Sequence, residues 1–201
     1  QLLKGTRETI LERRHADEIT CDVSDMIWLL FGSAVHSVID QHEETATQIK
    51  EERIKVRFGD YTLSGQFDLY DDSIGRVTDY KTTSVWKIIY GNYQDWRKQV
   101  LMYCLMLRKI GFNARSGEIV AILKDHSKRD AKLKPDYPKY PVRVITFEDF
   151  TEKDFNECEQ WIQSKFSEIQ NAEKLPDDEL PICTPEERFN SGDKFAVMKE
   201  G

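Results

Sequence analysis

Apolar residues recur at helical spacing in four stretches of the chain, residues 4–16, 25–47, 93–111 and 151–170. The third stretch is the most apolar, which is typical of a helix buried in a core. The fourth begins with Thr151 and carries Asp154 three residues later, a pair that resembles a capping box. The pattern therefore predicts four helices.

Alternation of apolar and polar residues favours half-buried strands in five further stretches, residues 48–58, 61–70, 76–83, 117–124 and 140–148. Tight turns separate the first three, so we expect them to form a three-stranded antiparallel meander. Residues 82–93 and the lysine- and proline-bearing segment before the last strand are expected to be loops. The elements predict an α/β fold with a central mixed β-sheet, built from this meander and further strands and flanked by helices.

Both ends of the chain carry regular patterns as well. It opens on the helical pattern at 4–16 and closes on a strand pattern at 194–201. Its 201 residues are enough for one domain with a substantial core. We therefore expect a single domain over residues 1–201, cut at both ends from a longer chain.

Composition sets only broad limits on the protein. Hydrophobic residues make up 39% and charged residues 32% of the chain, as in an ordinary globular protein. No apolar run approaches the roughly 20 residues that span a bilayer, and no signal-peptide pattern is present, so we expect no membrane partner. The cysteines form no CxxC pair, which favours reduced thiols and a cytoplasmic location. They are Cys21, Cys104, Cys158 and Cys183.

The net charge of −7 argues weakly against a partner held by non-specific charge alone, such as a nucleic-acid coat protein. Residues 124–143 nevertheless carry seven lysines and arginines against three aspartates. This segment is either a phosphate-contacting strip or a solvated loop. Four aromatic residues near the loop at 82–93 either stack on unpaired bases or pack between loop and helix. They are Trp86, Tyr90, Tyr93 and Trp96.

Acidic residues occupy unusual positions in the second and third strands of the meander. If Asp68 faces Asp79, residues 72–75 form a four-residue loop, a common hairpin length. Opposed side chains lie on one face about 5 Å apart, and strand periodicity places Lys81 on the same face. Two such carboxylates repel each other unless a cation lies between them, and carboxylate oxygens suit Mg²⁺. A solvated surface salt bridge is the alternative interpretation.

These residues belong to a longer series of motifs. The series comprises "GSAVHSVID" with His36, "GQFDLY" with Gly65 and Asp68, "TDYKTT" with Asp79 and Lys81, and "KQVLMY" with Gln99 and Tyr103. In this order the motifs resemble the PD-(D/E)xK nuclease superfamily, and more closely its RecB-like, phage-type exonuclease branch. That branch is marked by a histidine on an early helix, a Gly-x-x-Asp strand, an Asp-x-Lys strand and Gln-x-x-x-Tyr on the next helix. The resemblance covers most of residues 24–107 and implies a restriction-endonuclease-like core.

The resemblance also implies roles for individual residues. Asp68 and Asp79 are implied to be metal ligands, joined by the backbone carbonyl of Tyr80. His36 is implied to be a further ligand or to shape a second metal position. Lys81 is implied to be the catalytic lysine.

Gln99 and Tyr103 lie four residues apart, and hence on one helix face. The resemblance implies that they contact the DNA or order the site, completing the catalytic set. Two of the assignments have a structural alternative. A lone histidine such as His36 is often a surface or core residue, and Tyr103 lies in the apolar run "VLMYCLML", where an aromatic residue often belongs to the core.

The resemblance implies a DNA exonuclease that uses Mg²⁺ or Mn²⁺ to hydrolyse phosphodiester bonds in phage, prophage or bacterial recombination and repair. Some relatives bind an iron-sulfur cluster through four cysteines, but the clustered trio is missing here and we expect no cluster. DNA is the expected partner, and a homo-oligomer or a recombination protein is a further one. Two alternatives stay open: a non-catalytic nucleic-acid-binding module with the same fold, and the nuclease domain of a helicase-nuclease complex.

Overall fold

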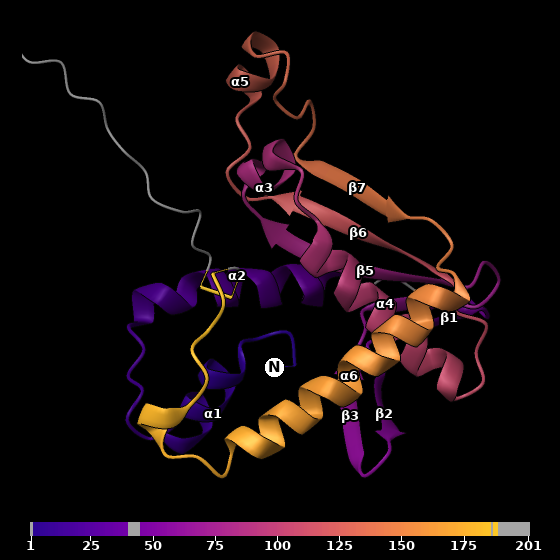
Figure 1. Cartoon of the computed structure of the whole chain (residues 1–201). Helices are drawn as coiled ribbons and strands as arrows, with labels where there is room; N and C mark the ends of the chain where they lie inside the picture. The colour runs from indigo at the N-terminus through magenta and orange to yellow at the C-terminus, as the bar shows by residue number, and fades with distance from the viewer. Residues whose placement is uncertain (1, 40–44, 186, 189–201) are drawn as a thin grey trace, which may run out of the picture. The chain divides into compact units, whose positions relative to one another are not determined.

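The computed structural model describes residues 2–39, 45–185 and 187–188 (Figure 1). The chain divides into two compact units. The larger unit, Cys21–Trp161, contains every described strand and all the residues of the predicted site. The smaller unit combines Gln1–Thr20 with Ile162–Gly201. The expectation of a single domain stays a prediction.

Two helices, five consecutive strands and two further helices precede β6 in the described chain. The helices are α1 (Thr6–Arg14), α2 (Val23–Ile39), α3 (Val85–Tyr90), α4 (Gln94–Lys109), α5 (Lys128–Leu133) and α6 (Glu152–Ala172), followed by the 3₁₀ turn η1 (Asp177–Glu179). The strands are β1 (Gln48–Lys50), β2 (Arg53–Phe58), β3 (Tyr61–Gln66), β4 (Leu69–Asp71), β5 (Arg76–Thr83), β6 (Ser116–Leu123) and β7 (Val142–Phe147). Within the described residues, no helix is both long enough and apolar enough to span a membrane.

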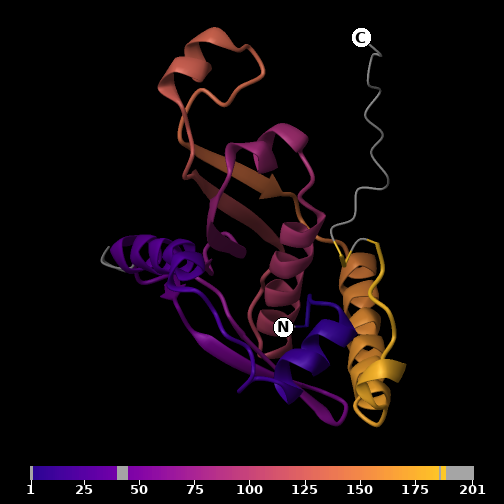
Figure 2. The same ribbon diagram turned by 90° about the vertical axis from the view of Figure 1, so that its left-hand side faces the viewer.

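The central sheet has the strand order β1-β4-β5-β6-β7. β5 and β6 are parallel, and the other neighbours are antiparallel, so the sheet is mixed. The views in Figures 1 and 2 place α2 and α4 on opposite sides of this sheet. The predicted fold class, a mixed sheet flanked by helices, is therefore confirmed, and the antiparallel run β1-β4-β5 is its meander.

The first two predicted strands, 48–58 and 61–70, are each interrupted and form one long, bent hairpin. β1 pairs with β4 and β2 pairs with β3 in a common register. Between the two pairings, Glu51 N–H donates to the carbonyl of Asp68 at 3.0 Å. Glu51 has a positive φ of 44°, which only a local bend explains. The prediction of two continuous strands was wrong at this point, where four consecutive charged residues, 50–53, interrupt the alternation and leave Ile49 and Ile54 out of phase.

Other predicted boundaries also needed correction. The second predicted helix, 25–47, is described as α2 up to Ile39; residues 40–44 lie outside the described residues, and residues 45–47 are not helical. The predicted loop 82–93 contains α3, which Ser84 caps by accepting a hydrogen bond from Trp86 N–H at 3.3 Å. The predicted strand at 194–201 lies outside the described residues.

α4 and α6 begin and end close to the predicted positions. α4 rests directly on β6, since a Cβ added to Gly117 would lie 1.9 Å from Cγ1 of Val100. α6 opens with the predicted capping box: Thr151 N–H donates to Asp154 Oδ2 at 2.9 Å, and Asp154 N–H donates to Thr151 Oγ1 at 3.2 Å. The smaller unit has its own apolar cluster of Ile10, Ala172 and Leu180.

Candidate active site

The candidate site is centred on β5, which pairs with β4 on one side and β6 on the other. This central position buries Asp79, whose residue surface is only 2% exposed. Lys81, two residues further along the strand, places its Nζ 2.8 Å from Asp79 Oδ2. A buried carboxylate is costly unless it has a charged partner, and Lys81 supplies one while remaining partly exposed.

Asp68 reaches the same region from the bend between β3 and β4. The register of β4 with β5 is the one that the turn length predicts, and it ends at the pair Leu69 and Thr78. Asp68 lies one position beyond that pair, outside the ladder. Its Oδ2 accepts a hydrogen bond from Tyr80 N–H at 2.7 Å. The bend thus directs this carboxylate at the backbone next to Asp79.

Gln99 and Tyr103 approach Asp79 from α4. The amide Nε2 of Gln99 lies 3.4 Å from Asp79 Oδ1 and donates to Tyr103 Oη at 3.1 Å. Burial raises the pKa of Tyr103 above its usual value, although the hydrogen bond from Gln99 acts to lower it. Tyr103 is therefore a neutral hydroxyl that holds the amide in place.

Gly65 has a steric reason to be glycine. A Cβ added there would lie 3.0 Å from Cε1 of Tyr103 and 3.3 Å from Sδ of Met106. The absence of a side chain in β3 lets α4 approach, and with it the ring of Tyr103. In the Gly-x-x-Asp motif, the glycine thus allows the close contact with α4, and the aspartate three residues later lies at the bend.

His36 lies on α2, but its side chain is outside the described part of the structure. Among the residues whose side chains are described, no group of three histidines, cysteines, aspartates or glutamates is gathered closely enough to hold a metal ion. The structure therefore brings together Asp79, Lys81, Gln99 and Tyr103, with Asp68 one backbone contact away.

The chemistry of this donor set suits a divalent cation. Asp79 Oδ2 is buried, and within the described residues it receives no well-aligned hydrogen bond, although the ammonium of Lys81 is close. A buried carboxylate oxygen with an open lone pair favours a cation. Asp68, Asp79 and the carbonyl of Tyr80 offer the oxygen ligands that Mg²⁺ and Mn²⁺ prefer.

An open cleft of ≈ 630 Å³ lies beside β5, and no residue of the set around Asp79 lines it. It is lined by Gly32 and Ser33 of α2, by Glu51 at the hairpin bend and by Thr82, which follows Lys81 directly. The sequence pattern did not single out Glu51 or Thr82. The position of Thr82 next to the Asp-x-Lys motif was an available signal, and so was the run of charged residues 50–53, which interrupts the alternation at Glu51.

Comparison with known proteins agrees with this geometry. One solved structure, described as "Crystal structure of SSO0001", superposes with a TM-score of 0.55 at 13% sequence identity, over 83% of this chain and 72% of the other. That likeness supports the fold alone. A search of curated proteins found no match. The profile of the PD-(D/E)XK nuclease superfamily matches residues 8–185, most of the sequence. The chain belongs to the PD-(D/E)XK nuclease superfamily.

Proposed function

We propose that this protein is a deoxyribonuclease that uses Mg²⁺ or Mn²⁺ to hydrolyse phosphodiester bonds. The observation that carries the proposal is the arrangement on β5. There the buried carboxylate of Asp79 has Lys81 at 2.8 Å and the amide of Gln99 at 3.4 Å. A purely structural salt bridge needs neither a second carboxylate nor an amide beside it. Asp68 supplies that carboxylate through its contact with Tyr80 N–H.

Each side chain has a defined task in this proposal. Asp68 and Asp79 hold the cation, together with the carbonyl of Tyr80 and with His36 as a further ligand. A divalent cation bound there supplies positive charge for the phosphate and lowers the pKa of a water. Lys81 orients the attacking water and stabilises the negative charge that develops on the phosphate oxygens.

Gln99 and Tyr103 act as positioning residues in the same scheme. Gln99 donates its amide hydrogens toward Asp79 Oδ1 and Tyr103 Oη, which fixes the direction of the Asp79 carboxylate. Ligand oxygens must be held to within a fraction of an ångström for efficient catalysis. The pair therefore keeps Asp79 aligned while the negatively charged substrate approaches.

The ordered set of motifs from His36 to Tyr103 favours an exonuclease of the RecB-like, phage-type branch over an endonuclease. On this basis we propose a cytoplasmic role in phage, prophage or bacterial recombination and repair. A homo-oligomer or a recombination protein is the proposed protein partner, and no iron-sulfur cluster takes part.

The test is to incubate the protein with end-labelled linear DNA and with closed circular DNA, in Mg²⁺, Mn²⁺ or EDTA. We expect cleavage of the linear DNA in either metal, none in EDTA, and survival of the circular DNA. Cleavage of the closed circular DNA at the same rate would show that the protein is an endonuclease and not an exonuclease. Absence of cleavage in both metals would overturn the nuclease proposal itself.

A further inference from the structure

The β6–β7 connection and α3 form a surface outside the site on β5. We call residues 124–141 the arm. It contains α5 and projects beyond the ends of β6 and β7 beside α3 (Figures 1 and 2). The candidate active site uses no residue of the arm or of α3.

The arm is fixed to α3 by hydrogen bonds at its base. Asp125 accepts hydrogen bonds from Ser84 Oγ at 2.6 Å and from Val85 N–H at 2.7 Å. Burial acts to raise the pKa of Asp125, but these hydrogen bonds hold it below its usual value. Within the arm, the hydroxyl of the buried Tyr137 accepts a hydrogen bond from Ser127 N–H at 2.9 Å. The arm and α3 are therefore held in a defined arrangement.

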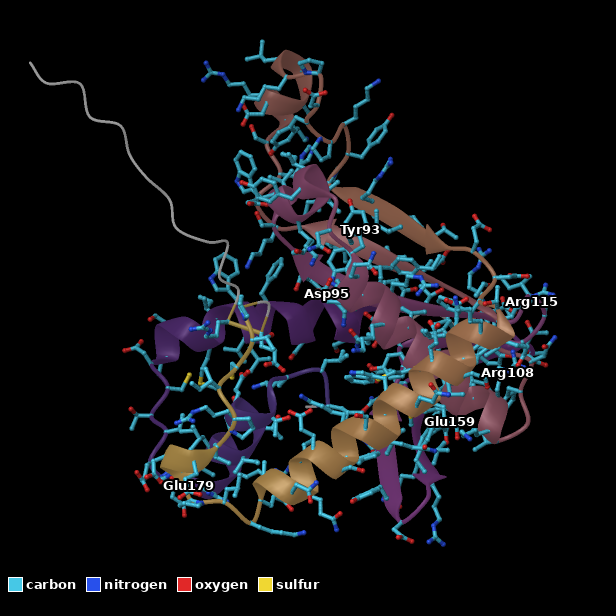
Figure 3. All side chains as sticks on the ribbon, in the orientation of Figure 1. Tyr93, Asp95, Arg108, Arg115, Glu159 and Glu179 are labelled. Atoms are coloured by element: carbon cyan, nitrogen blue, oxygen red, sulfur yellow. The ribbon has the colours of Figure 1, made fainter. Side chains whose placement is uncertain are left out.

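α4 holds α3 from the other side. Lys87 Nζ lies 2.8 Å from Asp95 Oδ1, and Tyr93 Oη donates to the carbonyl of Ile88 at 3.1 Å. Figure 3 labels Tyr93 and Asp95 at the beginning of α4, close to α3. α3 is short, so these contacts rather than its own length keep it in place.

A groove of ≈ 460 Å³ lies between α3 and the arm. Trp86, Ile89 and Tyr137 give it apolar and aromatic walls. Three carboxylates, of Asp125, Asp130 and Asp136, also line it against one ammonium, that of Lys134, so its interior disfavours a phosphate. Apolar and aromatic walls with carboxylates beside them are suited to bind a flat, uncharged ring.

Exposed aromatic rings continue from the groove along α3. Trp86 is 54% exposed and Tyr90 is 77% exposed. Their rings stack on each other at 5.8 Å with an interplanar angle of 27°. Large aromatic side chains are costly to leave in water, and an exposed stacked pair is a typical platform for unpaired bases.

The outer side of the arm carries positive charge, against the −7 of the whole chain. Four basic residues of the arm and one in β7 are exposed, and none forms a salt bridge with any residue that the structure describes. They are Lys128, Arg129, Lys132, Lys139 and Arg143. Free basic side chains next to an aromatic groove match the alternation of phosphate and base in a nucleic-acid strand.

We propose that the groove between α3 and the arm binds an unpaired base of single-stranded DNA, and that the basic residues of the arm bind the phosphates beside it. The proposal rests on the proposed nuclease function, because it names the form of DNA that leads to the site. Trp86 follows Lys81 by five residues, which span at most about 18 Å of extended chain. An unpaired strand cut at Lys81 reaches the groove within a few nucleotides.

The test compares binding of a fluorescent single-stranded oligonucleotide and a blunt duplex of the same length by anisotropy, in EDTA so that neither is cut. We expect the double variant W86A/Y90A to weaken single-strand binding at least about tenfold and to leave duplex binding within about twofold. The variant K128E/R129E should weaken single-strand binding and make its logarithmic dependence on salt shallower by about 1.4.

The matched control is K55E/R57E, which changes the same charges on the exposed face of the β2–β3 hairpin, at the other end of the larger unit (Figure 1). It should bind single strands as the wild type does. Circular dichroism of each variant verifies the fold. Unchanged single-strand binding by W86A/Y90A, or an equal loss in the control, would overturn the inference.

A second readout separates this inference from the nuclease proposal. If the wild-type protein cuts no DNA in Mg²⁺ or Mn²⁺, the nuclease proposal is wrong. If the wild type cuts, and W86A/Y90A cuts single-stranded and blunt ends in the wild-type ratio, only the groove inference fails.

Discussion

At the scale of single residues, Asp79 shows how one side chain serves both fold and chemistry. It is almost fully buried on the central strand β5, where a carboxylate has a high desolvation cost. Lys81 and Gln99 offset that cost from the same strand and from α4. The sequence predicted the pairing of Asp79 with Lys81, because side chains two apart on a strand share a face.

Replacing Gln99 with leucine removes the amide but keeps the apolar volume beside Asp79. We expect cleavage to fall by about tenfold to 100-fold with little change in DNA affinity, because the carboxylate loses its alignment rather than its charge. Tyr103→Phe should have a smaller effect, since it removes only the acceptor that holds the amide. Cleavage rates and anisotropy in EDTA measure the two quantities. A Q99L enzyme with the wild-type rate would contradict the positioning role.

Replacing Gly65 with alanine tests the close approach of α4. The added Cβ would lie 3.0 Å from the Tyr103 ring, so we expect unfolding free energy to fall by about 1–3 kcal/mol. Ser64→Ala, a change at the exposed neighbouring position, is the control and should have little effect. Urea denaturation of both variants provides the measurement, and equal stability of the two would argue against steric contact.

At the scale of elements, long periodic segments were predictable and short or bent ones were not. α4 and α6 have clear periodicity and a terminal signal such as the Thr151–Asp154 capping box. α3 and α5 have six residues each, too few for periodicity to separate them from loops. The break in the long hairpin was missed although the charged residues 50–53 interrupt the alternation, so that Ile49 and Ile54 are out of phase.

The beginning of α6 gives a pH-dependent prediction. Hydrogen bonds from Thr151 and from Arg97 hold the pKa of Asp154 well below its usual value. A carboxylate with a lowered pKa in the folded state stabilises the protein above its unfolded pKa of about 3.9, and this stability is lost as the pH falls through the folded value. Asp154→Ala should therefore cost about 1 kcal/mol at pH 7.

The cost of Asp154→Ala should shrink as the pH is lowered below about 4, because the carboxylate of the unfolded chain then becomes protonated, which favours unfolding of the wild type. Denaturation with urea at pH 7 and at pH 3 measures both values. Glu157→Ala, on the exposed side of the same helix, is the control and should show no such pH dependence. A D154A cost that is independent of pH would contradict the assignment.

The packing of α4 against β6 can be tested with a pair of variants. Gly117→Ala should be strongly destabilising, by about 3 kcal/mol or more, because its Cβ would overlap Cγ1 of Val100. Adding Val100→Ala removes that methyl group and should recover part of the loss. If the double variant lost as much unfolding free energy as the two single variants together, or more, the contact with Val100 would not be the cause of the Gly117→Ala loss.

At the scale of the whole molecule, the charge distribution and the division into two units were the least predictable features. The sequence shows seven basic residues between positions 124 and 143, but it does not show that six of them lie on an arm beside α3. Nor does periodicity show that the first helix and the end of α6 belong to one compact unit. Such features depend on contacts between segments that are distant in the sequence, whereas each motif from His36 to Tyr103 is a short stretch that can be identified in the sequence itself.

The central claim is that β5 carries a metal-dependent nuclease site with Lys81 as its catalytic amine. The most direct measurement is the rate of label release from linear DNA in Mg²⁺ by Lys81→Ala, with the exposed Lys55→Ala as control. The account predicts a loss of at least about 100-fold for Lys81→Ala in a protein that circular dichroism shows to be folded, at unchanged DNA affinity, and wild-type activity for the control. A folded Lys81→Ala protein that cuts at the wild-type rate would contradict it.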